Sequence, residues 1–155
     1  MAKKSKNTTK KITNRRASYD YQLSDSFTAG IVLTGRETKS LRLGHGHIRG
    51  AYITFKNNEL WLINSTITGS KGIAIDETEQ TRDRKLLVKK NELKAIVQAK
   101  NQGLSIIPTE ILTGQRYIKL RLSLGRGKKH YDKRQVIKKR DQNRSNEIEL
   151  QKSNY

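Results

Sequence analysis

The spacing of large apolar residues along this chain is mostly that of short β-strands. Residues 27–34 (FTAGIVLT) form a continuous apolar run rich in β-branched side chains, which is typical of a buried strand. Gly30 interrupts that run and predicts a bulge or bend there. Residues 116–124 (RYIKLRLSL) alternate apolar and polar letters, so they predict a strand with one apolar face and one basic face.

Further strands are predicted where similar runs are bounded by turn residues. Residues 47–55 and 59–67 flank the Asn-containing turn 56–58, which is the pattern of a β-hairpin. Shorter strands are expected at 19–23, 84–88 and 104–112, with a turn or the start of a helix at 24–26. Pro108 predicts that its strand either lies at an edge of the sheet or begins at that residue.

Two segments have helical spacing. A short helix is predicted between Gly35 and Gly44, and an amphipathic helix over residues 89–101, closed by Gly103. The polar segment 69–83 is expected to be the least structured internal part. Because there is no alternation of strands and helices and no repeat, the prediction is a mainly β fold: a small OB-like closed β-barrel with flanking short α-helices, spanning residues 14–124.

Charge is concentrated at the two ends of the chain. The 155 residues include 33 Lys and Arg and 14 Asp and Glu, for a net charge of +19, which favours a polyanionic partner. Residues 1–16 hold seven basic and no acidic side chains, and residues 125–144 hold nine basic and two acidic ones. We therefore expect a disordered basic N-terminal arm at 1–13 and a basic C-terminal tail at 125–155.

Few residues are suited to chemistry. The chain has no cysteine, which excludes disulfides, thiolate metal sites and thiol catalysis. No apolar run approaches the roughly 18 residues needed to span a bilayer, so we expect no membrane role. His45 and His47 resemble a metal pair but lack an evident third ligand, and solvent-facing imidazoles in a turn are the simpler interpretation. We expect no enzyme, no metal and no cofactor.

Basic residues beside aromatic ones favour RNA as the polyanion. Arg15 and Arg16 precede Tyr19 and Tyr21. Cations neutralise phosphates, and aromatic rings offer faces on which unpaired bases stack. Partial burial in the first strand is an equal alternative for the two tyrosines.

The predicted short helix carries a second basic group. Arg36, Lys39 and Arg42 follow a spacing of three, which places neighbouring members on one surface. Glu37 lies among them and would repel phosphate, so it either orients an arginine or accepts a hydrogen bond from a base edge or a 2′-hydroxyl. A surface helix of mixed charge is the alternative interpretation.

Five blocks of residues occur in a specific order. They are N-x-x-A-x-Y-x-Y at 14–21, AGIVLTG-x-E-x-KSLR at 29–42, ELWL-x-N at 59–64, R-x-RKLL at 82–87 and GRGKKHYDKR at 125–134. Together these blocks resemble the SmpB (small protein B) family, whose members bind tmRNA in bacterial trans-translation.

The resemblance implies an OB-like barrel that grips the tRNA-like domain of tmRNA and brings charged tmRNA to stalled ribosomes for peptide tagging. It implies a monomer in the bacterial cytoplasm, with the ribosome and, through charged tmRNA, elongation factor Tu as further partners. A basic OB-like ribosomal or translation-factor protein that binds rRNA is the alternative. The residues expected at the tmRNA interface, from the resemblance and from the basic and aromatic pattern, are Asn14, Arg15, Arg16, Tyr19, Tyr21, Glu37, Lys39, Ser40, Arg42, Lys85, Leu87 and Lys119.

The resemblance also implies a tail that is disordered when free and becomes helical on the ribosome. Its first section would enter the small-subunit decoding centre, and the following stretch would enter the empty mRNA channel. The tail residues expected to act there are Gly127, Lys128, Lys129, Tyr131, Asp132, Lys133, Arg134, Lys138, Lys139 and Arg140. Tyr131 stands where some members have His, and Lys89 stands where some have Asn. A tyrosine can stack on a base but cannot replace an imidazole.

Overall fold

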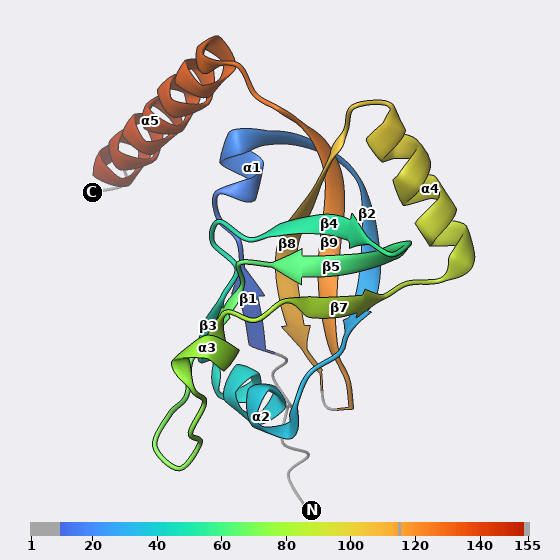
Figure 1. The fold of residues 1–155 in the computed structure, drawn as a ribbon. Helices are drawn as coiled ribbons and strands as arrows, with labels where there is room; N and C mark the ends of the chain where they lie inside the picture. The colour runs from blue at the N-terminus through green and yellow to red at the C-terminus, as the bar shows by residue number, and fades with distance from the viewer. Residues whose placement is uncertain (1–9, 115, 154–155) are drawn as a thin grey trace, which may run out of the picture.

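The fold is a strongly curved antiparallel β-sheet with helices around it (Figure 1). The computed structural model describes residues 10–114 and 116–153. Its elements in chain order are β1 (Lys10–Thr13), α1 (Ala17–Asp20), β2 (Tyr21–Ile31), α2 (Gly35–Leu43), β3 (Gly46–His47), β4 (Tyr52–Lys56), β5 (Glu59–Ile63), β6 (Thr66–Ile67), α3 (Glu77–Gln80), β7 (Arg84–Leu87), α4 (Lys90–Asn101), β8 (Ser105–Thr113), β9 (Ile118–Gly127) and α5 (His130–Ser153). The mainly β class predicted from the apolar spacing is confirmed.

Seven strands form one sheet in the order β1-β8-β9-β2-β7-β5-β4, and β3 pairs with β6 in a separate ribbon. The short strands β4, β5 and β7 cross the long strands β8, β9 and β2, so the sheet curls back over itself (Figure 1). The ends of the curl approach each other, because β4 lies near β8. No pairing joins β4 to β8 within the described residues, so the predicted barrel is not closed by hydrogen bonds. Side chains of both strands line a cavity at this junction instead.

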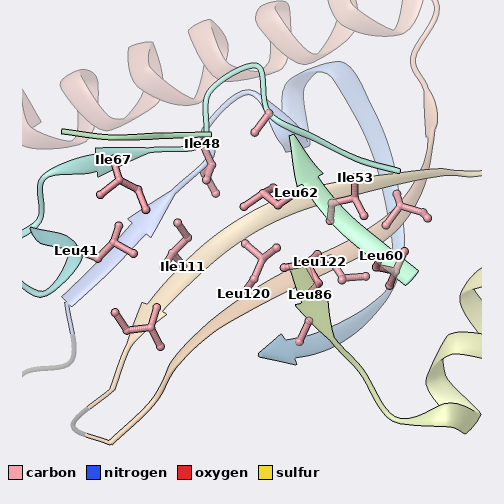
Figure 2. Close-up of a cluster of buried hydrophobic side chains, with 14 of the residues drawn as sticks. Leu41, Ile48, Ile53, Leu60, Leu62, Ile67, Leu86, Ile111, Leu120 and Leu122 are labelled. Atoms are coloured by element: carbon pink, nitrogen blue, oxygen red, sulfur yellow. The ribbon is translucent and has the colours of Figure 1, made fainter. Parts of the chain in front are cut away.

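Leucine and isoleucine side chains fill the inside of the curl (Figure 2). Leu120 and Leu122 of β9 are fully buried and lie among Leu60 of β5 and Leu86 of β7. Every second residue of β9 from 118 to 124 is buried, which confirms the apolar face predicted for that strand. Burial of these side chains away from water is the main force that holds the two layers together.

Two local predictions are confirmed in detail. The helix α2 begins with a capping box, in which Thr34 and Glu37 each accept a backbone N–H of the other, and ends at Gly44 with φ of 93°. The β4–β5 hairpin turns at Asn57 and Asn58, whose φ values are 51° and 59°. Asparagine tolerates this left-handed conformation, which a two-residue hairpin turn requires.

The N-terminal region is more regular than expected. The disordered arm predicted for 1–13 does not include residues 10–13, because they form β1 and pair with β8 from Thr113 to Glu110. Ile12 packs against the core, and β1 satisfies the backbone groups along that edge of β8. Residues 1–9 lie outside the described residues.

Residues 17–26 differ from their predicted strand and turn. Residues 17–20 form the one-turn helix α1, which buries Ala17 and rotates Tyr19 toward α5. Residues 24–26 lie inside β2, where the register with β9 shifts between Leu23 and Ser26. The predicted irregularity at Gly30 is absent, since Gly30 pairs regularly with Leu87 on one side and Lys119 on the other.

Two internal segments also need correction. Pro108 is neither at the sheet edge nor at the start of its strand, because β8 lies between β1 and β9. A register shift between Pro108 and Glu110 accommodates the missing N–H. The polar segment 69–83 is anchored by Ile73 and Ile75, both buried in the core, and contains α3.

The C-terminal tail, predicted to be disordered when free, is a helix in the structure, and β9 extends to Gly127 before it begins. This 24-residue helix contains no Gly or Pro, and Asp132 accepts the N–H of Lys129 in its first turn. Almost all its side chains are exposed, and it projects away from the sheet beside α1 (Figure 1).

Candidate nucleic-acid interface

A buried ion-pair cluster fixes the start of α2 against the sheet. The carboxylate of Glu37 accepts hydrogen bonds from the Nε of Arg82 at 2.9 Å, the Nε of Arg84 at 3.0 Å and the N–H of Thr34 at 2.8 Å. Glu37 and Arg84 are each 1% exposed. Glu37 therefore orients arginines, which is one of the two roles considered for it. Because its carboxylate is buried, the expectation that it contacts RNA directly is corrected.

The guanidinium of Arg84 joins three segments to this cluster. Its Nη1 donates to the carbonyl of Ser65 at 2.8 Å and the hydroxyl of Ser65 at 2.9 Å. Its Nη2 donates to the carbonyls of Glu79 at 3.2 Å and Gln80 at 2.9 Å. A buried charge is tolerated only when it is paired and its donors are satisfied, and both conditions are met here. Glu37 and Arg84 are thus structural residues that position the outer face of α2.

Opposing influences set the ionisation of this pair. Burial alone would raise the pKa of the Glu37 carboxyl, but hydrogen bonds from Arg82 and the Thr34 N–H, with the charge of Arg84, hold that pKa below its ordinary value of 4.5. Burial lowers the pKa of Arg84, and the charge of Glu37 opposes that shift. The pair is therefore ionised at neutral pH.

The outward side of α2 carries the cations. Lys39 and Arg42 are exposed, whereas Ser40 between them is fully buried and donates its hydroxyl to the carbonyl of Thr68. Arg36 is exposed as well and reaches the carbonyl of Ala74 at 3.4 Å. The expectation that Ser40 contacts RNA is corrected, because its side chain faces the core.

A shallow depression of about 290 Å³ lies beside the N-terminal half of α2. In the sheet, Gly30 lies between Leu87 and Lys119, and a Cβ on Gly30 would lie 3.4 Å from the Cβ of Leu87. Leu87 is 54% exposed and Tyr117 is 70% exposed, so an apolar residue and a ring face solvent next to the charges of Arg116 and Lys119. Thr38 of α2 completes the rim. This combination of ring, apolar surface and cations suits an unpaired base and its phosphates.

The other predicted residues lie at the opposite end of β2. Asn14 has a structural role there, because its Nδ2 donates to the carbonyl of Pro108 at 3.0 Å and its Oδ1 accepts the N–H of Arg16. Asn14 is half-buried and also lines a cavity, so its contact with RNA stays a prediction. Arg15 and Arg16 are exposed, and Tyr21 is half-buried beside a cavity.

The first residues of the tail are clasped to α1. Lys128 donates its N–H to the carbonyl of Asp20 at 2.8 Å and its Nζ to the carbonyl of Ser18 at 2.7 Å. Lys133 pairs with the carboxylate of Asp20 at 2.9 Å and lies 5.7 Å from the centre of the Tyr19 ring. Beyond this α1–α5 clasp, the tail residues Lys129, Tyr131, Arg134, Lys138, Lys139 and Arg140 are exposed.

The histidines and acidic residues of the described chain do not form a metal site. Across residues 10–114 and 116–153, no three His, Asp or Glu side chains gather where they could hold a metal ion. His45 and His47 are both exposed. None of the helices in the described part of the chain is long and apolar enough to cross a membrane.

Comparison with known proteins identifies the family. A family model described as SmpB protein matches residues 11–152. The chain belongs to the SmpB family. The match covers the sheet, the buried cluster and nearly all of α5, so the SmpB family model includes both the sheet and the tail.

Individual relatives support the SmpB match over most of the chain. An SsrA-binding protein of Mesomycoplasma hyopneumoniae (strain 232) is 46% identical over 134 residues, covering 86% of this chain and 90% of the relative. An SsrA-binding protein of Rhizobium meliloti (strain 1021) is 43% identical over 146 residues, covering 92% of each. A chain in a solved structure described as "tmRNA-SmpB: a journey to the center of the bacterial ribosome" has a TM-score of 0.64 and 37% identity, covering 77% of this chain and 85% of that chain.

The structure divides the residues that the SmpB resemblance assigned to tmRNA into separate groups. One group combines Lys39 and Arg42 of α2 with Leu87 and Lys119 of the depression beside it. We call this group, together with Arg116 and Tyr117 of the β8–β9 turn, the α2 surface. Asn14, Arg15, Arg16, Tyr19 and Tyr21 lie around α1. Lys85 belongs to neither group, because it pairs with Glu59 at 2.6 Å on the outside of the sheet.

Sequence reasoning missed two residues of the α2 surface. Arg116 and Tyr117 were read only as part of a strand, although they lie in the turn before β9. An aromatic residue beside cations in a predicted hairpin turn was the available signal, because turn residues face solvent.

Proposed function

We propose that this chain binds the tRNA-like domain of tmRNA and delivers charged tmRNA to stalled ribosomes for trans-translation. The observation that carries the proposal is one family match that spans both the sheet and the tail. The relatives are SsrA-binding proteins, and the solved structure is described as tmRNA-SmpB in the bacterial ribosome. The partners of this chain are accordingly tmRNA and the ribosome.

We propose the α2 surface as the place where the tRNA-like domain binds. Its exposed cations, Lys39 and Lys119, neutralise phosphates, while Tyr117 and Leu87 offer a ring and an apolar contact to bases. The buried pair Glu37–Arg84 contributes indirectly by holding α2 in place. Arg42 adds a further positive charge on the same helix.

Binding to a transcript of the tRNA-like domain tests this surface. Lys39→Gln with Lys119→Gln should weaken binding about tenfold and should reduce the slope of log K against log salt by roughly 1.4–1.8, because two phosphate contacts are lost. The matched control is Lys90→Gln with Lys94→Gln, which removes the same charge from exposed positions on α4. Equal weakening in both double variants would show that only net charge matters.

Purification of the tagged protein from bacterial lysate separates tmRNA from the alternative partner. We expect an RNA with a tRNA-like end to co-purify with the protein. If ribosomal RNA fragments co-purify and no tRNA-like RNA does, the chain is instead an rRNA-binding ribosomal or translation factor.

For the tail, we propose that residues 127–134 act in the decoding centre and that the rest of α5 occupies the empty mRNA channel. Truncation after Lys128 keeps the N–H contact to Asp20 and all of β9. This truncation should leave binding to the tRNA-like domain within about twofold but abolish peptide tagging on stalled ribosomes. Loss of binding to the tRNA-like domain would show that the tail serves as an RNA anchor.

The proposal also includes the barrel, the cellular location and the elongation-factor contact that the resemblance implies. The sheet forms an OB-like barrel that closes where the edge strand β4 lies beside β8. The chain acts as a cytoplasmic monomer, meets elongation factor Tu through charged tmRNA, and carries out no chemistry itself. Backbone hydrogen exchange would test the barrel, because a closed barrel protects the outer N–H groups of β4.

A further inference from the structure

The junction of β4 and β8 contains a cavity of about 730 Å³, at the end of β2 opposite the α2 surface. Tyr21 at the start of β2 lines this cavity, while Gly30 and Ile31 at its end line the depression beside α2. With about 3.3 Å of rise per residue, these two sites are about 30 Å apart along the strand. A second ligand could therefore bind without displacing the first.

The wall and floor of the cavity are apolar and aromatic. Ile53, Ile106 and Ile107 are at most 6% exposed and form its base. Tyr21 and Tyr52 line its sides, and Tyr52 is 52% exposed. Its volume lies within the roughly 300–1,000 Å³ that ligand pockets commonly have.

Cations surround this apolar floor. Arg16, Arg49 and Lys100 line the cavity and are exposed, and Asp20 is the one acidic residue among the lining side chains. The carboxylate of Asp20 already pairs with Lys133 at 2.9 Å and Arg16 at 3.7 Å. Arg15, Arg16 and Arg49 also line an adjoining depression of about 370 Å³, so they form a basic ridge between two hollows.

The cations that frame the cavity are held by local structure. The loop that carries Arg49 is closed by the N–H of Ala51 donating to Ile48 and by Asn64 donating to the carbonyl of Gly50 at 3.2 Å. The Nζ of Lys100 lies 4.8 Å from the centre of the Phe55 ring. The backbone at Arg49 and the ammonium group of Lys100 are therefore positioned before any ligand arrives.

We propose that this cavity is a second RNA site, which takes an unpaired nucleotide with its base between Tyr21 and Tyr52 and its phosphates on the basic ridge. Rings accept the face of an exposed base, and the cations neutralise the flanking phosphates. The cavity adjoins the α1–α5 clasp through Arg16 and Asp20, so the bound RNA lies where the tail begins. The inference rests on the proposed function for the choice of RNA as ligand, and it gives a separate site to Arg15, Arg16 and Tyr21, which the resemblance assigned to tmRNA.

Binding of fluorescein-labelled tetraadenylate to the full chain, followed by fluorescence anisotropy, tests the site. Arg49→Gln with Lys100→Gln should weaken binding about fivefold or more and lower the salt slope by roughly 1.4, the value for two phosphates of a single strand. Lys90→Gln with Lys94→Gln is again the matched control and should change affinity by less than twofold.

An abasic tetranucleotide with the same phosphates separates base binding from charge attraction. Tyr52→Ala should weaken tetraadenylate binding by about fivefold or more, Tyr52→Phe should keep it, and neither should change binding of the abasic strand. Equal binding of both strands to the wild-type chain would overturn the proposal, because the cavity would then be only a polyanion patch.

The same variants keep this inference distinct from the proposed function. Arg49→Gln with Lys100→Gln should bind the tRNA-like domain within twofold of wild type, since the α2 surface is unchanged. Loss of tetraadenylate binding with full tRNA-like domain binding supports a second site. If the double variant binds tetraadenylate as tightly as the wild-type chain does, the second site is overturned and the proposed function still stands. If the wild-type chain does not bind the tRNA-like domain, only the proposed function is overturned.

Discussion

Two carboxylates in this molecule are each held by two cations, and their surroundings differ. Glu37 is 1% exposed and pairs with Arg82 at 2.5 Å and Arg84 at 2.8 Å. Asp20 is 30% exposed and pairs with Lys133 at 2.9 Å and Arg16 at 3.7 Å. The same chemistry therefore occurs once inside the fold and once at the surface.

The comparison teaches that burial decides what an ion pair can do. An exposed pair contributes about 0–1 kcal/mol and is screened by salt, so a phosphate can replace its carboxylate. A buried pair cannot lose one partner without leaving a charge in a medium of low polarity. The Glu37 cluster is thus suited to holding a surface in shape, and the Asp20 clasp is suited to exchanging partners.

Removal of the buried charge should have the largest effect. Glu37→Gln keeps the size of the side chain but leaves Arg84 buried without a counter-charge, and we expect the free energy of unfolding to fall by about 3–5 kcal/mol. Urea unfolding followed by circular dichroism measures the change. The control is Glu59→Gln, whose partner Lys85 is 34% exposed, and it should cost less than about 1 kcal/mol. A similar loss of unfolding free energy in Glu37→Gln and Glu59→Gln would show that burial does not set the strength of these ion pairs.

Double-mutant cycles compare the two clasps directly. The cycle of Glu37→Gln with Arg84→Met should give a coupling energy of about 1–3 kcal/mol, because the second change removes the charge that the first leaves unpaired. The cycle of Asp20→Asn with Lys133→Met should give less than about 1 kcal/mol. A larger coupling energy for Asp20 and Lys133 than for Glu37 and Arg84 would contradict the conclusion that burial makes the Glu37 pair the stronger one.

The dependence of the free energy of unfolding on pH should further separate the Glu37 cluster from the Asp20 clasp. The pKa of Glu37 is lowered in the folded state, so its contribution is fully present above its ordinary value of 4.5 and is lost as pH falls through the folded pKa. The difference in free energy of unfolding between wild type and Glu37→Gln should therefore narrow as the pH falls below about 4.5. A difference that stays constant across this range would contradict the lowered pKa.

The smallest effect is expected at the exposed clasp. Asp20→Asn should change the free energy of unfolding by about 0.2–1 kcal/mol, yet it should speed hydrogen exchange in the first turns of α5, because Lys133 loses its partner. Raising salt to about 0.5 M should have the same effect on the wild-type chain. Unchanged exchange in both cases would show that contacts other than Asp20 hold the helix.

Local signals in the sequence predicted much of the fold. The alternation in residues 118–124, the glycines around α2 and the paired asparagines of the hairpin each act over a few neighbouring residues, and each was confirmed. The helix α1 was missed, because a single turn is too short to show a helical period. The position of Pro108 was missed, because the bulge that tolerates it depends on its pairing with β9.

The candidate sites depend more on distant contacts. Glu37 lies 45 positions from Arg82 and 47 from Arg84, so no local pattern shows that its carboxylate is buried. Lys100 and Arg49 meet at one cavity only because α4 ends beside β4. The resemblance located the interface residues along the chain, but only the fold shows which of them face solvent.

The clasp of Lys128 and Lys133 on α1 also makes α5 a lever with a fixed pivot. With 24 residues, the helix is about 36 Å long, and it touches the rest of the protein near its first turn. A tilt of about 10° at the pivot moves the far end by about 6 Å. Because the carboxylate of Asp20 lies at this pivot, its contacts limit how far the basic residues near the other end of α5 can move.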